Sequence, residues 1–205
     1  MSLFIPTYFS PISQFGKMYQ CNAITFEVED NFQKQTYRNR CYIYGANGKQ
    51  LLNIPIKHSK SNNKKKTKDI RIEAGSRWQK QHYKSLKTAY NSSPFFEFYE
   101  DDIVDIFEKE YVFLQDLNFD TFQFINEALE LNLSYNESLE YELYPDNDYR
   151  VLASVKAQPH YLSNTYTQMF DEKYGYIENL SILDLLFMEG PNSINFLEKV
   201  TVTLL

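Results

Sequence analysis

The stretch QKQTYRNRCYIYGANGKQLLNIPIKH, residues 33–58, decides how the fold of this chain is interpreted. Apolar and polar residues alternate on both sides of Asn47 and Gly48, and a period of two is typical of a strand that is buried on one face. The Asn-Gly pair supplies the two positive-φ positions that a type I′ turn needs. The sequence therefore predicts a β-hairpin at about residues 38–57.

The register of this hairpin assigns its side chains to two faces. A two-residue loop at the Asn-Gly pair sets Tyr44 opposite Leu51 and Cys41 opposite Ile54. One face is then apolar and is expected in the core; it comprises Cys41, Ile43, Leu52, Ile54 and Ile56. The other face is cationic and aromatic and comprises Arg38, Arg40, Tyr42, Tyr44, Asn53 and Lys57.

The remaining elements follow from periodicity and from helix-start signals. Ser76 and Gln79 have capping-box spacing at the start of a helix that runs to about Tyr90. Residues 132–163 show no sustained periodicity and are expected to be irregular. Strands are expected at residues 2–6, 23–29 and 70–72, and further helices near residues 12–18, 94–107, 120–131, 181–190 and 191–199.

These elements predict a mixed α/β fold in which a small sheet, including the hairpin, is covered by several helices. A chain of 205 residues that is 43% hydrophobic can bury one core of normal size, so we expect a single domain over residues 1–205. The sequence contains no run of 18 apolar residues, and its start lacks the basic and long apolar regions of a signal peptide. A cytoplasmic location without a membrane span is therefore expected.

Charge is strongly segregated along the chain. Residues 57–71 contain seven Lys or Arg against one acid, whereas residues 94–148 contain 16 Asp or Glu against Lys109 alone. A basic loop beside an acidic body favours an anionic small ligand or a protein partner over a broad nucleic-acid surface. Neither the two cysteines nor the three histidines have metal-ligand spacing, so no metal site is expected.

Four stretches, in this order, resemble the WbqC-like proteins of bacteria, in particular the shorter branch typical of Bacteroidetes. They are YFSPISQFGKM at 8–18, the hairpin stretch, WQKQHYKSLKTAYNSSPFFEFYEDD at 78–102 and YGYIENLSILDLLFMEGPN at 174–192. The usual MQPYFFP start of the family is altered here to PTYFSP, residues 6–11, without its Gln. Longer relatives have an additional αβ segment where this chain has the irregular stretch 150–170.

The resemblance implies a group-transfer enzyme of surface polysaccharide or O-antigen synthesis, which moves an aminoacyl or acyl group onto a nucleotide-linked amino sugar. Arginine can hold phosphate oxygens bidentately and tyrosine can stack on a base or sugar. His58 at the hairpin end, or His82 beside Trp78, could serve as a general base near neutral pH. No nucleophile with a neighbouring base is visible, which favours direct transfer, and no cofactor is indicated. The candidate ligand-binding residues are Tyr8, Tyr37, Arg38, Asn39, Arg40, Tyr42, Trp78 and Gln79.

Two other interpretations compete with this one. Arg38 and Arg40 could instead pair with the acidic residues of Glu100–Asp105 and hold the fold together. A scaffold protein without catalytic turnover could recruit polysaccharide enzymes through the lysines of loop 58–68, above all residues 64–66. Nucleic-acid binding is weaker, because the acidic remainder of the chain would repel a phosphate backbone.

Overall fold

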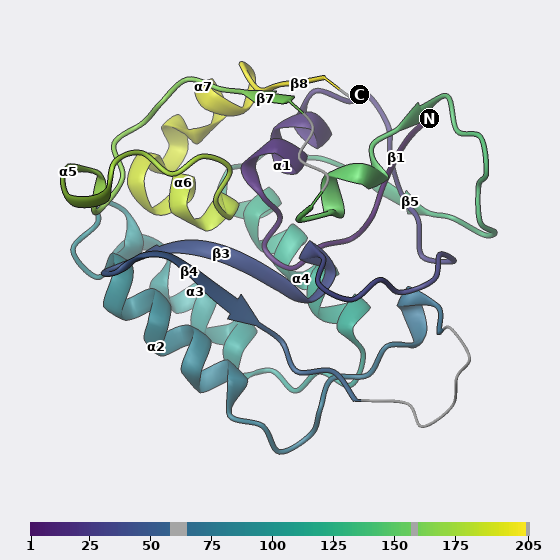
Figure 1. The fold of residues 1–205 in the computed structure, drawn as a ribbon, viewed down its shortest axis with the longest axis horizontal. Coiled ribbons are helices and arrows are strands. Elements are labelled where there is room, and N and C mark those ends of the chain that lie inside the picture. The colour runs from purple at the N-terminus through teal and green to yellow at the C-terminus, as the bar shows by residue number, and fades with distance from the viewer. Residues whose placement is uncertain (58–64, 157–159, 204–205) are drawn as a thin grey trace.

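The computed structural model describes residues 1–57, 65–156 and 160–203, and it confirms the mixed α/β fold class (Figure 1). Four short strands form a parallel sheet in the order β5-β2-β1-β6. They are β1 (Ser2–Phe4), β2 (Ile24–Phe26), β5 (Tyr135–Glu137) and β6 (Asn147–Asp148). The chain thus builds the sheet outward from β1 in one direction and returns to its other side with β6.

The strand order creates a switch point beside β1. Helix α1 (Ile12–Tyr19) connects β1 to β2, and the helical segments of the middle of the chain connect β2 to β5. The connection to β6 then crosses to the opposite side of β1. In open parallel sheets, ligands commonly bind outside the carboxyl ends of the strands at such a point.

The predicted hairpin forms, as strands β3 (Arg40–Gly45) and β4 (Gly48–Asn53), but it is a two-stranded sheet of its own. It packs against α2 (Trp78–Tyr90) and α6 (Ile182–Glu189) and lies between them in Figure 1. The predicted register is wrong by two residues, since Cys41 pairs with Leu52. The loop is residues 46–47, and of the turn residues only Gly48 has a positive φ, 93°.

A shift of two residues preserves the face of every side chain, so the predicted apolar face is buried at Cys41, Ile43, Leu52 and Ile54, and Ile56 is partly buried. The cationic and aromatic face needs a correction at two positions. Tyr44 is fully buried, and Arg38 lies in the 3₁₀ helix η1 (Tyr37–Asn39) before the strand and is 2% exposed.

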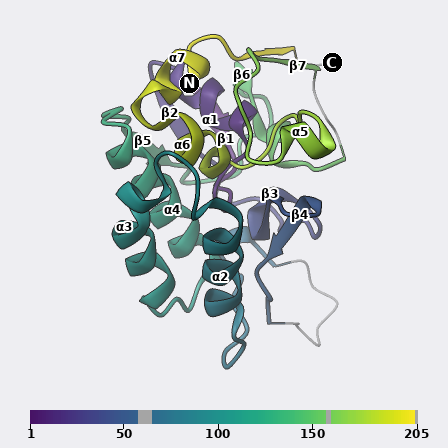
Figure 2. The ribbon, with the colours of Figure 1, turned by 90° about the vertical axis from the view of Figure 1, so that its left-hand side faces the viewer.

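The principal helices are α2 (Trp78–Tyr90), α3 (Phe96–Glu108), α4 (Leu114–Ala128) and α6 (Ile182–Glu189). In Figure 2 the sheet, α1 and α6 occupy one half of the molecule, and α2, α3 and the hairpin occupy the other. The shorter elements are η2 (Thr67–Asp69), η3 (Arg150–Ala153), β7 (His160–Leu162), α5 (Asp171–Tyr174), η4 (Gly190–Asn192), α7 (Ser193–Leu197) and β8 (Thr201–Thr203).

Several local expectations are wrong. The capping box at α2 does not form, because the Ser76 hydroxyl donates to the Glu73 carbonyl instead. Helix α4 begins at Leu114 and not near residue 120. Residues 70–72 form isolated bridges and no strand, whereas the segment predicted to be irregular supplies β5 and β6.

Candidate functional site

The cavity at the switch point, here called the carboxyl-edge cavity, has a volume of about 810 Å³. Ile5 follows β1, Asp30 lies in the loop after β2, and Asp148 ends β6, and all three line it. Arg38, Lys66 and Arg150 bring positive charge to the same walls. The sheet topology therefore gathers both signs of charge at its carboxyl edge.

Arg38 is held in the wall of this cavity by Asp30. Its Nη2 donates to Asp30 Oδ2 over 2.5 Å, and its Nη1 donates to the Thr36 hydroxyl over 3.3 Å. The other Asp30 oxygen accepts from the Thr67 hydroxyl. Burial lowers the pKa of Arg38, and the Asp30 carboxylate opposes that effect. The interpretation that Arg38 pairs with the acidic helix is wrong; its partner lies eight residues before it.

A second ion pair fixes the end of β6. Arg150 Nε and Nη2 donate to the two oxygens of Asp148 over 2.9 and 2.6 Å, and Nη1 donates to the Glu142 carbonyl over 2.7 Å. Hydrogen bonding from Arg150 lowers the pKa of Asp148, so this carboxylate is ionised at neutral pH. Its side chain is 43% exposed, against 7% for Asp30. Asp148 is thus the more accessible of these two carboxylates.

The basic segment also approaches the cavity. Lys66 and Lys68 both form ion pairs with Glu29, and Lys66 lines the cavity. Hydrogen bonds from the two lysines lower the pKa of Glu29. The segment at Lys66–Lys68 is therefore tied to the loop that follows β2, whereas residues 58–64, which include His58 and Lys64, lie outside the described residues.

Arg40 and Asn39 lie on the other side of Phe32, in a different cavity of about 540 Å³. Phe32 lines both cavities. Neither arginine pairs with the acidic residues at Glu100–Asp105; the groups that bind Glu100 are the Tyr83 hydroxyl and Lys87. The two predicted arginines therefore serve neighbouring cavities.

Three predicted residues meet in the core instead. Tyr8, Trp78 and His82 contact one another, and the Tyr8 hydroxyl lies 3.0 Å from His82 Nδ1. Tyr8 is fully buried and the other two are 5% exposed. Burial lowers the pKa of His82 to about 4, so the ring is neutral at neutral pH. His82 therefore sits as a hydrogen-bonded core residue away from the charged cavity.

The other predicted residues are dispersed. Tyr37 is 3% exposed and contacts Tyr42 edge to face, with ring centroids 6.1 Å apart. Gln79 donates from Nε2 to the Lys109 carbonyl over 2.7 Å and, with Trp78, lines a cavity of about 340 Å³. Of the predicted ligand-binding residues, only Arg38 lines the carboxyl-edge cavity.

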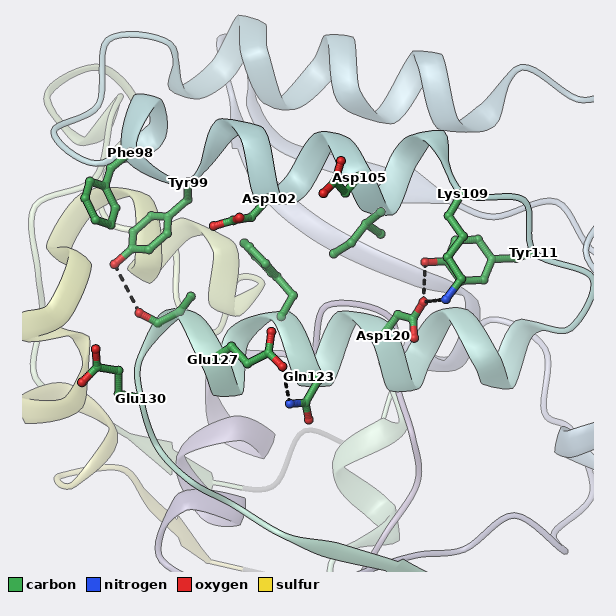
Figure 3. A pocket seen from close by; sticks show the side chains of 13 residues that line it. Phe98, Tyr99, Asp102, Asp105, Lys109, Tyr111, Asp120, Gln123, Glu127 and Glu130 are labelled. Carbon is green, nitrogen blue, oxygen red and sulfur yellow. Dashed lines mark hydrogen bonds and ion pairs between the residues drawn. The ribbon is translucent and has the colours of Figure 1, made fainter.

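An acidic groove of about 530 Å³ lies between α3 and α4 (Figure 3). Asp102 and Asp105 extend into it from α3, and Asp120 and Glu127 from α4. Asp120 already accepts hydrogen bonds from Lys109 and Tyr111. Because carboxylates dominate its lining, this groove repels an anionic ligand. Among the described residues, no group of His, Cys, Asp and Glu could hold a metal ion, and no helix is long and apolar enough to cross a membrane.

Sequence reasoning missed Asp30, Asp148 and Arg150. The positions after β1 and β2 could have been suspected, because carboxyl ends of parallel strands commonly carry functional side chains. The strand that ends at Asp148 has only two residues and no periodicity, so its pairing with β1 could not be predicted.

Fold and cavity define the class: an open parallel α/β protein with a charged cavity at the carboxyl edge of its sheet. The model of the WbqC-like protein family matches residues 6–163, and the chain belongs to that family. The match includes the hairpin, η1 and the parallel strands β2, β5 and β6. Strand β1 ends at residue 4, before the match begins. Comparisons with curated proteins and with solved structures found no match.

Proposed function

We propose that this protein binds a nucleotide-activated amino sugar in the carboxyl-edge cavity and transfers an acyl or aminoacyl group to it, as a cytoplasmic step of surface polysaccharide or O-antigen synthesis. The observation that carries the proposal is the strand order β5-β2-β1-β6, which sets Asp148 next to β1 at the switch point, in a cavity that Arg38 and Lys66 also line. Family membership supports the same direction, and the sequence features favour the shorter, Bacteroidetes-type branch.

The charges of the cavity suit the two ends of such a ligand. Arg38 and Lys66 would face the phosphates, and the unpartnered Nε of Arg38 has no acceptor among the described residues. Asp148, ionised and partly exposed, would hold the ammonium of the amino sugar. Tyr141 is 47% exposed and offers an aromatic face at the cavity wall. The Arg150 guanidinium lies over this ring, with 5.0 Å from Arg150 Cζ to the ring centroid of Tyr141.

Direct transfer fits this arrangement better than a covalent intermediate. The described residues that line the cavity include no cysteine and no histidine, and Cys41 is buried in the core, where burial raises the pKa of its thiol. In a direct step, the ammonium first gives up a proton to the solvent, and the free amine forms the new C–N bond to the donor carbonyl. The bond to the donor's leaving group breaks with its electron pair on that group, which takes up the second proton of the amine nitrogen.

The scaffold function has less support. Lys66 and Lys68 both pair with Glu29, whose single negative charge offsets one of their two positive charges at a partner surface. If the lysines alone recruit partners, a Lys64→Ala, Lys65→Ala, Lys66→Ala variant loses every partner in a pull-down. We expect it to keep them.

The first test is a melting experiment with UDP-, dTDP-, GDP- and CMP-linked amino sugars. Val151 lines the cavity and is 37% exposed, so Val151→Trp should fill the cavity without disturbing the core. Val112 is 54% exposed and lines the separate Trp78 cavity, so Val112→Trp is the matched control.

A ligand at about 100 times its Kd stabilises by about 2.7 kcal/mol, which raises the Tm of a chain of this size by about 5–10 °C. We expect this rise in the native protein and in Val112→Trp, and its loss in Val151→Trp. A rise that persists in Val151→Trp would place the ligand elsewhere. No rise with any of the four sugars would reject the substrate class.

A further inference from the structure

The cavity of about 540 Å³ beyond Phe32, here called the Arg40 cavity, has walls fixed by backbone pairing. Arg40 lies directly opposite Asn53 in the hairpin register. The Ile54 N–H donates to the Asn39 carbonyl over 2.9 Å, and the Glu73 N–H donates to the Pro55 carbonyl over 2.9 Å. The side chains of Arg40, Asn39 and Glu73 therefore start from positions that the fold holds in place.

The polar groups of this cavity have unused binding capacity. The Arg40 side chain forms no hydrogen bond or ion pair with any described residue, although Glu73 lines the same cavity. Arg40, Glu73 and the exposed Lys34 thus bring both signs of charge to one cavity, and Arg40 does not pair with Glu73. The Arg40 guanidinium can therefore offer N–H donors to a carboxylate or phosphate.

Asn39 adds an acceptor at the same wall. Its Nδ2 donates to the Ile54 carbonyl over 3.0 Å and to Asn53 Oδ1 over 3.3 Å, which fixes the orientation of the amide. Its Oδ1 consequently faces away from these groups and has no partner among the described residues, although the residue is only 6% exposed. A ligand N–H could supply the donor that this buried acceptor lacks.

Part of the remaining lining is apolar, and the polar side chains of Lys34, Gln35 and Asn53 complete it. Ile54 is fully buried, and Phe32, Pro55 and Ile56 are partly buried and line the same cavity. An apolar surface between a cation and an anion matches a zwitterion with a hydrocarbon body.

From this arrangement we propose that the Arg40 cavity binds an apolar α-amino acid. The ligand carboxylate lies on the Arg40 guanidinium, its ammonium lies toward Glu73 and Asn39 Oδ1, and its side chain covers Phe32 and Ile56. The site is separate from the carboxyl-edge cavity and does not depend on nucleotide-sugar binding there. The two proposals can therefore fail independently.

Isothermal titration calorimetry with L-leucine tests the site, with N-acetyl-L-leucine and L-leucinamide as probes that lack one charge each. The native protein should bind leucine and should bind each analogue at least about tenfold more weakly, since each analogue leaves one charge of the site unpaired. L-Isoleucine and L-phenylalanine serve as additional apolar amino acids.

The variants assign each charge. Arg40→Gln should weaken leucine binding by at least about tenfold and should abolish the preference for leucine over leucinamide. Glu73→Gln should abolish the preference for leucine over N-acetyl-leucine. Arg77→Gln is the matched control, because Arg77 is exposed and lies outside this cavity. Val151→Trp should leave leucine binding unchanged.

Three results would overturn the proposal. These are absence of heat with all three amino acids, equal leucine affinity in the native protein and Arg40→Gln, and an equal loss in Arg77→Gln. Circular dichroism and Tm of each variant confirm that it is folded, and we expect near-native values because Arg40 has no partner among the described residues.

Discussion

Asp184 provides a test of the buried hydrogen-bond network, because its carboxyl group is fully buried on α6. The Tyr90 and Tyr166 hydroxyls each donate to it over 2.6 Å, and Gln168 Nε2 donates over 3.2 Å. Ser181 caps this helix by accepting a hydrogen bond from the Leu183 N–H, and the Asp184 side chain in the first turn binds the three groups named above.

Burial raises the pKa of Asp184 from 3.8 to about 6, and its three hydrogen bonds oppose the rise. The native state therefore binds more protons than the unfolded chain between these values, so the stability falls as the pH increases through that window. At about 1.4 kcal/mol per pKa unit the full loss is about 3 kcal/mol, of which about 1.3 kcal/mol falls between about pH 5 and pH 7.

Urea unfolding of the native protein and of Asp184→Asn at both pH values measures this effect. Asparagine cannot ionise, so the difference in the free energy of unfolding between the two proteins should change by about 1.3 kcal/mol in favour of the variant as the pH rises. Subtraction removes the contributions of other titrating groups. Asp101→Asn, at an exposed site, is the control and should show no such change. A pH-independent difference for Asp184→Asn would refute the reasoning.

Three further predictions concern stability in urea at neutral pH. Arg38→Ala leaves the Asp30 carboxylate buried without its cation and should lower the free energy of unfolding by about 3–5 kcal/mol. Arg40→Ala should lower it by less than about 1 kcal/mol, and equal losses in the two variants would contradict the assigned partners. Tyr8→Phe removes the partner of His82 Nδ1 and should cost about 1–3 kcal/mol, and no measurable loss would mean that this bond is not formed. In Gly16→Ala the new Cβ would lie 2.5 Å from Val200 Cγ2, so the free energy of unfolding should fall by about 1–3 kcal/mol. Val200→Ala in the same chain should restore part of this stability, and additive losses in the double variant would rule out the contact.

The aromatic content, 17% of the residues, shows how far composition alone leads. It predicts a densely packed core, and Phe4, Phe15 and Phe26 are indeed buried there. It does not separate packing aromatics from ligand-facing ones. Tyr8 was predicted to contact a ligand, yet the same flat ring and single hydroxyl satisfy His82 in the core.

The sequence by itself determined the features that depend on neighbouring residues: the mixed α/β class, the hairpin near Gly48, the face that Cys41 occupies and the helix that ends at Tyr90. These depend on local periodicity and turn chemistry, which a short window of sequence contains. Family membership could likewise be anticipated from motifs.

Only the tertiary structure decided the site. Strands β5 and β6 are too short to have a period, and their parallel pairing with β2 and β1 joins segments more than 100 residues apart. That pairing brings Asp148 to the cavity that Arg38 also lines. The ion pair with Asp30 fixes Arg38 in the fold, whereas the described residues leave the Arg40 side chain unpaired. Such long-range choices depend on burial and on partner geometry, which no local pattern of residues encodes.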